Sequence, residues 1–171
     1  MAIEVAENGR PNLLKRSTKR KEAQKKIRTA VYLFFDNVNT FYFSVTSVSR
    51  IKTSHTVKVQ IPNLFSLIEK YIESEDVLKS NFLFENFVVE LLNENLKVYC
   101  DCEDFLYSGT KYYCYHNDAG IEPEDRKPQP DKEKRRSLLC KHLRFILVYI
   151  KRFSRAMARD LKKAVIARNK D

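Results

Sequence analysis

Two short doublets of metal-binding side chains constrain the fold of this chain more than any other feature. The first is Cys100-x-Cys102 and the second is Cys140-x-His142, with 37 residues between them. Three thiols and one imidazole make a full tetrahedral ligand set for zinc, which takes sulfur and nitrogen ligands. We therefore expect the two doublets to meet in space around Zn²⁺.

The four cysteines also allow two other interpretations, ordinary buried thiols and disulfides. Every cysteine, however, stands two residues from another metal-type ligand, because Cys114 is followed by His116. Random placement would rarely pair all of them. The N-terminal segment is basic and lacks the apolar stretch of a signal peptide, so no oxidising compartment is implied. These observations favour zinc over either alternative.

The third doublet, Cys114-x-His116, leaves the choice of ligands open. With Cys100 and Cys102 it would close a compact site that has eleven residues between the pairs. We prefer Cys140 and His142, because they lead into a strong helix and a helix orients ligands better than a loop. Residues 111–120 read instead as a turn-rich insert. Cys114 and His116 remain candidates for an alternative or second site.

The pattern C-x-C followed by C-x-H resembles the SWIM-type zinc finger, in which the second doublet opens a helix. The stretch 98–143 further resembles a group of SWIM-like proteins of tailed bacteriophages, whose C-x-C-x-D-F motif precedes a Tyr-rich segment, a Pro/Arg-rich insert and Cys-Lys-His-Leu. The matching residues are Asp104, Phe105, Tyr107, Tyr112, Tyr113, Arg126, Lys127, Pro128, Pro130 and Cys140-Lys141-His142-Leu143. The resemblance implies a virion protein, made in the host cytoplasm and built into the phage particle. Cys114 and His116 depart from the pattern.

The positive charge of the chain is concentrated at its two ends. Residues 1–30 carry nine Lys/Arg against three acids, and residues 141–171 carry ten against two. Residues 31–140 carry thirteen against seventeen, so the middle is mildly acidic. Basic ends of this kind either are simply solvated or contact polyanions and acidic surfaces. The expected partners are other virion proteins, and also DNA without sequence specificity.

Residue patterning predicts an α+β fold, with a small antiparallel sheet, a zinc-stapled insert and a long amphipathic C-terminal helix. β-Branched and aromatic residues over 30–49 predict two strands joined by a turn at 36–39. Strands are also predicted over 55–61 and 96–100, and helices over 64–72, with Asn63 as N-cap, and 84–92. His55 opens its strand with no cysteine nearby in the sequence, so we interpret it as a surface residue. The expected organisation is a basic arm over 1–29 and one zinc-binding domain over 30–171.

The clearest periodic pattern predicts a helix over 141–167. Its apolar residues fall on one arc and its basic residues on the opposite arc, which we expect to face outward. The apolar arc holds Leu143, Ile146, Leu147, Ile150, Phe153, Met157, Leu161 and Val165. The basic arc, the expected nucleic-acid or partner surface, holds Arg144, Lys151, Arg152, Arg155, Arg159, Lys162 and Lys163.

No catalytic constellation emerges from the sequence. There is no H-E-x-x-H motif and no Gly-rich phosphate loop. A site with four protein ligands leaves no open position for water. No apolar run approaches the roughly 20 residues of a membrane span. We therefore expect neither an enzyme, nor a small-molecule substrate, nor membrane contact. The expected function is a structural protein of the virion, and the alternative is a free SWIM-type accessory protein that binds nucleic acid.

Overall fold

The computed structural model describes residues 5–6, 10–11, 25–47, 54–72, 75–128 and 139–169. Most of the predicted basic arm lies outside these residues. Within it, β1 (Val5–Ala6) pairs antiparallel with β2 (Arg10–Pro11). Continuous description begins at Lys25, and β3 already begins at Ile27. Residues 27–29, which the sequence assigned to the arm, therefore belong to the first long strand of the domain.

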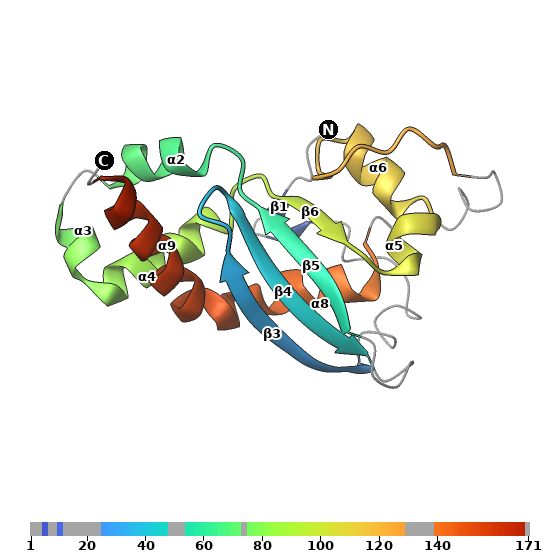
Figure 1. The fold of residues 1–171 in the computed structure, drawn as a ribbon, viewed down its shortest axis with the longest axis horizontal. Helices are drawn as coiled ribbons and strands as arrows, with labels where there is room; N and C mark the ends of the chain where they lie inside the picture. The colour runs from blue at the N-terminus through green and yellow to red at the C-terminus, as the bar shows by residue number, and fades with distance from the viewer. Residues whose placement is uncertain are drawn as a thin grey trace.

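The centre of the fold is an antiparallel sheet of four strands in the order β3-β4-β5-β6 (Figure 1). The strands are β3 (Ile27–Phe35), β4 (Thr40–Ser47), β5 (Ser54–Gln60) and β6 (Lys97–Cys100). The predicted turn between the first two strands is confirmed. There one carboxylate oxygen of Asp36 accepts hydrogen bonds from the backbone N–H groups of Val38, Asn39 and Thr40, at 2.9–3.0 Å.

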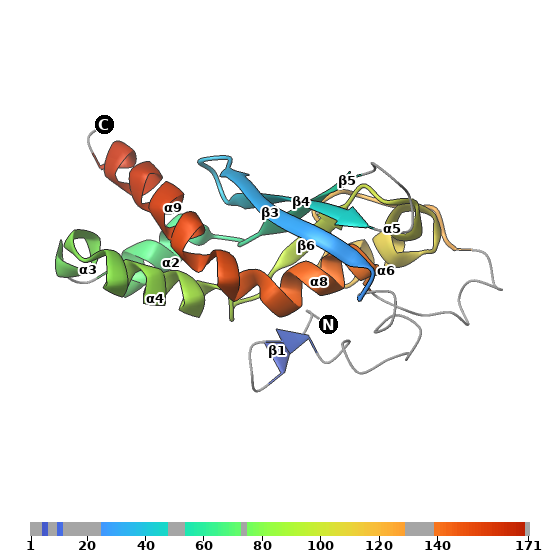
Figure 2. The ribbon, with the colours of Figure 1, turned by 90° about the horizontal axis from the view of Figure 1, so that it is seen from below.

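The C-terminal helices lie across one face of the sheet (Figure 2). The chain is helical from Lys141 to Arg168, as predicted, but not as one straight helix. It runs through α8 (Lys141–Tyr149), the 3-10 segment η2 (Ile150–Phe153) and α9 (Ser154–Arg168). A 3-10 segment advances about 120° per residue rather than about 100°, so η2 turns the faces of α9 by roughly 80° relative to those of α8.

Three further helices gather around α9 at one end of the molecule (Figure 1). They are α2 (Leu64–Tyr71), α3 (Glu75–Lys79) and α4 (Asn81–Leu91). The sequence predicted α2 and α4 but not the short α3. Asn63 does precede α2, but it adopts a left-handed conformation and its side chain makes no capping hydrogen bond. The expected cap at Asn63 is therefore wrong in mechanism.

The insert between the doublets folds against β6 at the other end of the molecule. It contains α5 (Glu103–Tyr107) and α6 (Thr110–His116), so the expected turn-rich loop over 111–120 is wrong for the first part of that range. After α6 the chain returns beside β6, where Val98 N–H donates to the Ala119 carbonyl at 2.8 Å. Gly120 is needed at this point, because a Cβ there would lie 2.7 Å from the Tyr115 backbone nitrogen.

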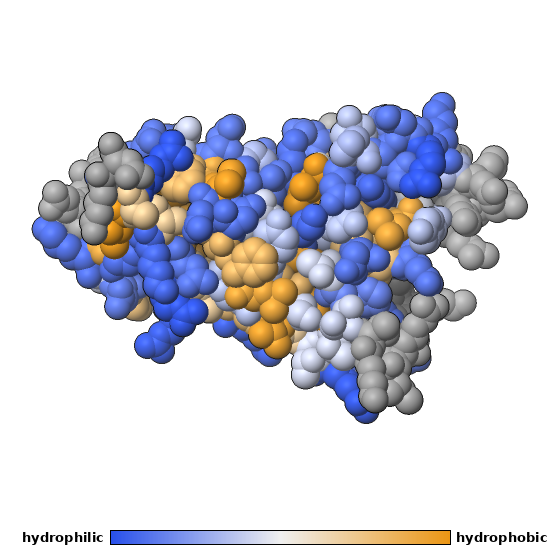
Figure 3. Space-filling view, in the orientation of Figure 1, coloured by the Kyte–Doolittle hydropathy of each residue, from blue (hydrophilic) through white to orange (hydrophobic). Residues whose placement is uncertain are grey.

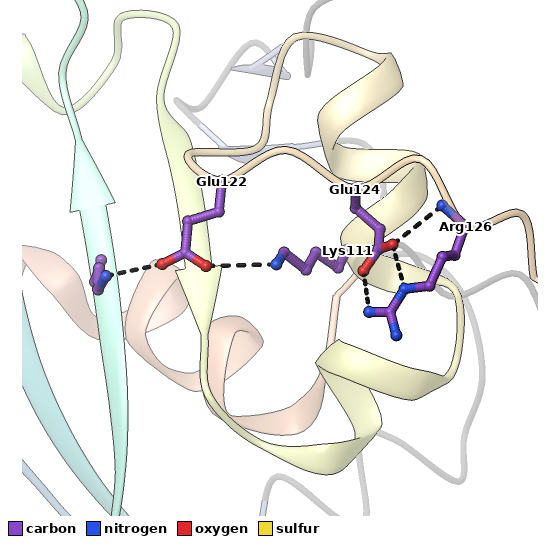
Figure 4. Close-up of polar contacts among 5 residues, drawn as sticks. Lys111, Glu122, Glu124 and Arg126 are labelled. Carbon is purple, nitrogen blue, oxygen red and sulfur yellow. Dashed lines mark hydrogen bonds and ion pairs between the residues drawn. The ribbon is translucent and has the colours of Figure 1, made fainter.

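Ion pairs fasten this returning segment to the domain (Figure 4). Glu122 joins the sheet to α6, since its carboxylate contacts Lys58 Nζ at 3.0 Å and Lys111 Nζ at 3.4 Å. Glu124 accepts hydrogen bonds from the backbone and side chain of Arg126, and this pairing lowers the pKa of the Glu124 carboxyl to about 2. The first part of the insert is thus an ordered layer beside the metal-type ligands.

The main core lies between the sheet and the C-terminal helices. Phe41, Phe43 and Val45 of β4 are fully buried, and every residue of the predicted apolar arc is buried except Phe153, which is half-buried. Tyr32 donates a hydrogen bond to Asp160 at 3.0 Å and so ties β3 to α9. In the part of the chain that the structure describes, no helix combines the length and apolar character needed to cross a membrane.

The opposite face of the sheet carries apolar surface near the end of β3 (Figure 3). Val31, Leu33 and Phe34 are each about half exposed there. The ring of Phe34 stacks on that of Tyr42, with 4.5 Å between centroids. An antiparallel sheet commonly packs one face on the core and leaves the other in water, which is the arrangement seen here.

Candidate metal centre

Three separate elements bring the two doublets together. Cys100 is the last residue of β6, and Cys102 is the N-cap of α5. Cys140 is the N-cap of α8, and His142 is the second residue of that helix. Because α8 packs against β5 and β6, it places the second doublet beside the end of β6. The 37 residues between the doublets can be accommodated because the cost of loop closure grows only logarithmically with length.

The four side chains form one compact buried cluster. Their potential ligand atoms all lie within 4.8 Å of one another, and no residue of the four is more than 3% exposed. A tetrahedral zinc ion with Zn–S bonds of about 2.3 Å would space its sulfur ligands about 3.8 Å apart. With a Zn–N bond of about 2.0–2.1 Å, a sulfur and an imidazole nitrogen would lie about 3.6 Å apart, and Cys100 Sγ and His142 Nδ1 are separated by 3.9 Å. The cluster therefore has the ligand types, the number and the compactness of a site that could hold a metal ion.

Each doublet also has a backbone N–H group directed at one of its sulfurs. The Phe105 N–H donates to Cys102 Sγ, and the Leu143 N–H donates to Cys140 Sγ, both at 3.4 Å. These bonds come from the first turn of α5 and of α8. A hydrogen bond to sulfur favours the thiolate, which is the form that binds metals. The two helix starts thus present Cys102 and Cys140 in similar geometry.

The close spacing of the three thiols couples their protonation. Hydrogen bonds from Cys100 and Cys140 hold the pKa of the Cys102 thiol far below its usual range. The pKa of the Cys100 thiol is raised by the hydrogen bond that this thiol makes with Cys102. The pKa of the Cys140 thiol is raised by burial. Three thiolates this close would repel one another strongly, so a cation is needed for all three to ionise. The chemistry of the donor set therefore fits a divalent ion.

His142 leaves one of its two ring nitrogens without a partner. Its Nε2 atom is buried and lacks a hydrogen-bond partner among the described residues. Buried polar atoms are nearly always paired, so an unpaired one in a native structure calls for an explanation. Nδ1 is the ring nitrogen that lies near Cys100 Sγ, so a metal ion bound through Nδ1 would leave Nε2 unpaired all the same.

Two residues that the sequence did not assign to the site pack directly against it. The ring of His55 lies against that of His142, with 4.4 Å between centroids. His55 Nδ1 contacts one carboxylate oxygen of Asp101 at 3.0 Å, and the other oxygen accepts from the Thr56 N–H. Our interpretation of His55 as a surface residue is wrong, because its side chain is only 22% exposed. The pairing of Val57 with Cys100 brings His55 beside the doublet, and that register cannot be read from either strand alone.

The alternative doublet lies outside the cluster. Cys114 is buried in α6, where desolvation raises the pKa of its thiol to about 12. His116 is exposed, and its ring packs against Tyr112 and Tyr115. Residues two apart on a helix point in widely different directions, so these two side chains do not converge. None of the four cysteines forms a disulfide, which removes that interpretation as well.

The predicted basic arc is divided by the 3-10 segment. Lys151, Arg155 and Arg159 are exposed as expected, and the half-buried Lys162 donates to Asn81 Oδ1 at 2.8 Å. Arg144 contradicts the prediction, because it is only 7% exposed. Arg144 lies on α8, six residues before η2, so η2 changes the phase of the later basic residues relative to it but does not account for its burial. The accessible basic surface therefore belongs to η2 and α9.

Comparison with models of known protein families, with curated proteins and with solved structures gives no match for this chain. The observed cluster agrees with the ligand set of a zinc finger. The relation to SWIM-type fingers and to phage virion proteins rests on the sequence resemblance alone. What the structure defines is an α+β protein with a buried three-cysteine, one-histidine cluster that could hold a metal ion.

Proposed function

We propose that the chain is a non-enzymatic structural protein stapled by one zinc ion. The observation that carries this proposal is the complete burial of Cys100, Cys102, Cys140 and His142 in a single cluster. Structural zinc sites have four protein ligands and are closed, whereas catalytic sites keep one position open for water or substrate. Zinc bound here would join β6, α5 and α8, which are otherwise held by the packing of short elements.

We further propose that this module is a virion component of a tailed phage that docks on neighbouring subunits. Two features support the proposal. One is the resemblance of residues 98–143 to SWIM-like phage proteins. The other is the basic surface of η2 and α9, where Lys151, Arg152, Arg155 and Arg159 are all exposed. Solvent-facing positive charge of this extent suits an acidic neighbour, through complementary potentials at the contact.

A virion component should be present in purified particles at a fixed copy number. We expect quantitative mass spectrometry of gradient-purified particles to find the chain in constant ratio to the major capsid protein across preparations. High-salt washing that strips adsorbed proteins should leave this ratio unchanged. If the chain appears in infected cells but not in particles, the virion role is wrong, and the free accessory protein of the alternative hypothesis takes its place.

Contact with DNA is a second candidate for the basic surface, because Arg155 and Arg159 share its exposed side with the half-buried Lys162. Positive charge that replaces counterions on phosphates gives affinity that falls steeply with salt, by about 0.9 in log–log slope for each phosphate contact. Replacing Arg155, Arg159 and Lys162 by glutamine should therefore flatten the salt dependence of duplex binding, measured by fluorescence anisotropy. Zinc content should stay unchanged. A triple variant that binds DNA as the parent does would exclude α9 as the DNA contact.

A further inference from the structure

A groove between α4 and α9 lies away from the metal centre. The two helices lie side by side (Figure 2), and their facing sides enclose a groove of about 960 Å³. Its lining runs from Arg152 to Ile166 along η2 and α9. That stretch corresponds to about 20 Å of helix at about 1.5 Å per residue. The groove is thus long enough to hold a helix of four turns.

The lining combines an apolar floor with a basic rim. The apolar lining residues, together called the floor, are Phe82, Phe84, Phe153, Ala156, Ala158 and Ile166. Of these, Phe84 and Ala158 are buried, whereas Phe82 is 72% exposed. Exposed apolar side chains that gather in one place are typical of a binding surface, and Ile166, which is 40% exposed, lines the same groove as Phe82. The rim consists of the basic lining residues Arg152, Arg155, Arg159, Lys162 and Lys163.

The charge of the rim is only partly compensated within the domain. Glu85 is the one acid among the described lining residues, and it accepts a hydrogen bond from Ser154 at 2.7 Å. Asp160, next to the groove, contacts Arg159 at 3.3 Å and Lys163 at 4.0 Å. Arg155 has no ion-pair partner within the part of the chain described. The groove therefore remains a positively charged cleft with an apolar base.

We propose that this groove binds an acidic amphipathic helix of another protein, and this inference rests on the docking role proposed above. An amphipathic helix lays its apolar face into a hydrophobic groove and meets the rim with its flanking side chains. Asp and Glu on those flanks would match the cations. Duplex DNA fits less well, because a phosphate backbone gains nothing from the apolar floor.

The occupant comes from a different chain. Residues 1–24, which lie mostly outside the described structure, carry six Lys/Arg against three acids, and residues 129–138 carry four against two. Both segments would be repelled by the basic rim. A second copy is disfavoured for the same reason, since each copy has a formal charge of +10. Charge complementarity thus selects an acidic partner.

The inference can be tested by selecting peptides that bind the chain, which does not require the natural partner to be known. A display library of 16-residue helix-forming peptides, randomised on its surface positions, is selected against the full-length zinc-loaded chain. We expect the enriched peptides to carry apolar residues at three- and four-residue spacing, flanked by Asp and Glu. Their affinities are then measured by fluorescence anisotropy for the parent and for three double variants.

The variants separate charge, apolar contact and unspecific electrostatics. Two of the variants should each weaken binding by about tenfold or more: Arg155→Glu with Arg159→Glu, and Phe82→Ala with Ile166→Ala. Loss of a side chain at the centre of an interface commonly weakens binding by at least this factor. The control, Lys25→Glu with Lys26→Glu, makes the same charge change at exposed residues outside the groove and should bind like the parent.

Three results would overturn the inference. The first is a set of enriched peptides without acidic residues, and the second is equal binding of the peptides to all variants. The third is displacement of the peptides by duplex DNA, with normal DNA binding by the apolar variant. The last result would make the groove a phosphate surface. None of these results changes the zinc content or the presence of the chain in particles. Conversely, absence from particles would overturn the virion role and leave the peptide result standing.

Discussion

Replacing Cys140 by serine is expected to abolish zinc binding and to destabilise the chain by several kcal/mol. Binding of structural zinc contributes its free energy directly to folding, about 10 kcal/mol or more in zinc-finger peptides. Cys140 is fully buried in the cluster, and a neutral hydroxyl is a poor replacement for a thiolate there. Elemental analysis should give about one zinc per parent chain and almost none for the variant. Thermal unfolding should show a large decrease in Tm.

The chain contains its own matched control in the doublet of Cys114 and His116. Cys114 is as buried as Cys140 but lies outside the cluster, so Cys114→Ser should cost only about 1–3 kcal/mol for burying a hydroxyl and should leave zinc bound. The same contrast should hold between His142→Ala and His116→Ala. Zinc lost from the Cys114 and His116 variants, but retained in the Cys140 and His142 variants, would establish the compact site instead. A parent protein purified without chelator, fully folded and free of metal, would exclude both sites.

The candidate site could be predicted from the sequence because its ligands are recognisable by residue type and spacing. Cysteine and histidine in C-x-C and C-x-H spacing have few other reasons to be paired, and the choice of Cys140 over Cys114 followed from the helix that begins at residue 141. The surroundings of the site could not be predicted in the same way. His55 and Asp101 are in contact because β5 pairs with β6. The alternation of side chains along a strand does not show which other strand it pairs with.

The errors in the helical regions have a common physical cause. The sequence shows which residues are apolar, but the period that relates them changes from 3.6 to about 3 residues per turn at η2. Arg144 is buried although the period of α8 alone places it off the apolar arc, so packing decides its environment too. Residues 110–116 form α6 although Tyr, Cys and His are indifferent helix formers, because Cys114 packs into the core beside β6. Tertiary packing decides such segments, and local propensity does not.

Phe43 of β4 should contribute much more to stability than Phe34 of the neighbouring strand β3. Phe43 of β4 is fully buried, and its ring packs against Tyr32 of β3 and Phe153 of η2, at 5.6 and 5.4 Å between centroids. It therefore joins the sheet to the C-terminal helices. Phe43→Ala removes these contacts and leaves a cavity, which costs about 3–5 kcal/mol for a buried phenylalanine. Urea unfolding at saturating zinc should show this loss as a lower midpoint with an unchanged slope.

Phe34→Ala is the matched control, because it removes the same side chain from the open face of the same sheet. Phe34 is 48% exposed and stacks only on one side, against Tyr42, so its loss should cost about 1 kcal/mol or less. Measuring the zinc affinity of both folded variants separates core packing from metal affinity, because stabilisation by a bound ligand depends on its dissociation constant even when the ligand is saturating. Equal losses for the two variants would mean that the open face of β3 is covered in solution. The apolar surface at Val31, Leu33 and Phe34 would then be a contact between chains rather than a solvated edge.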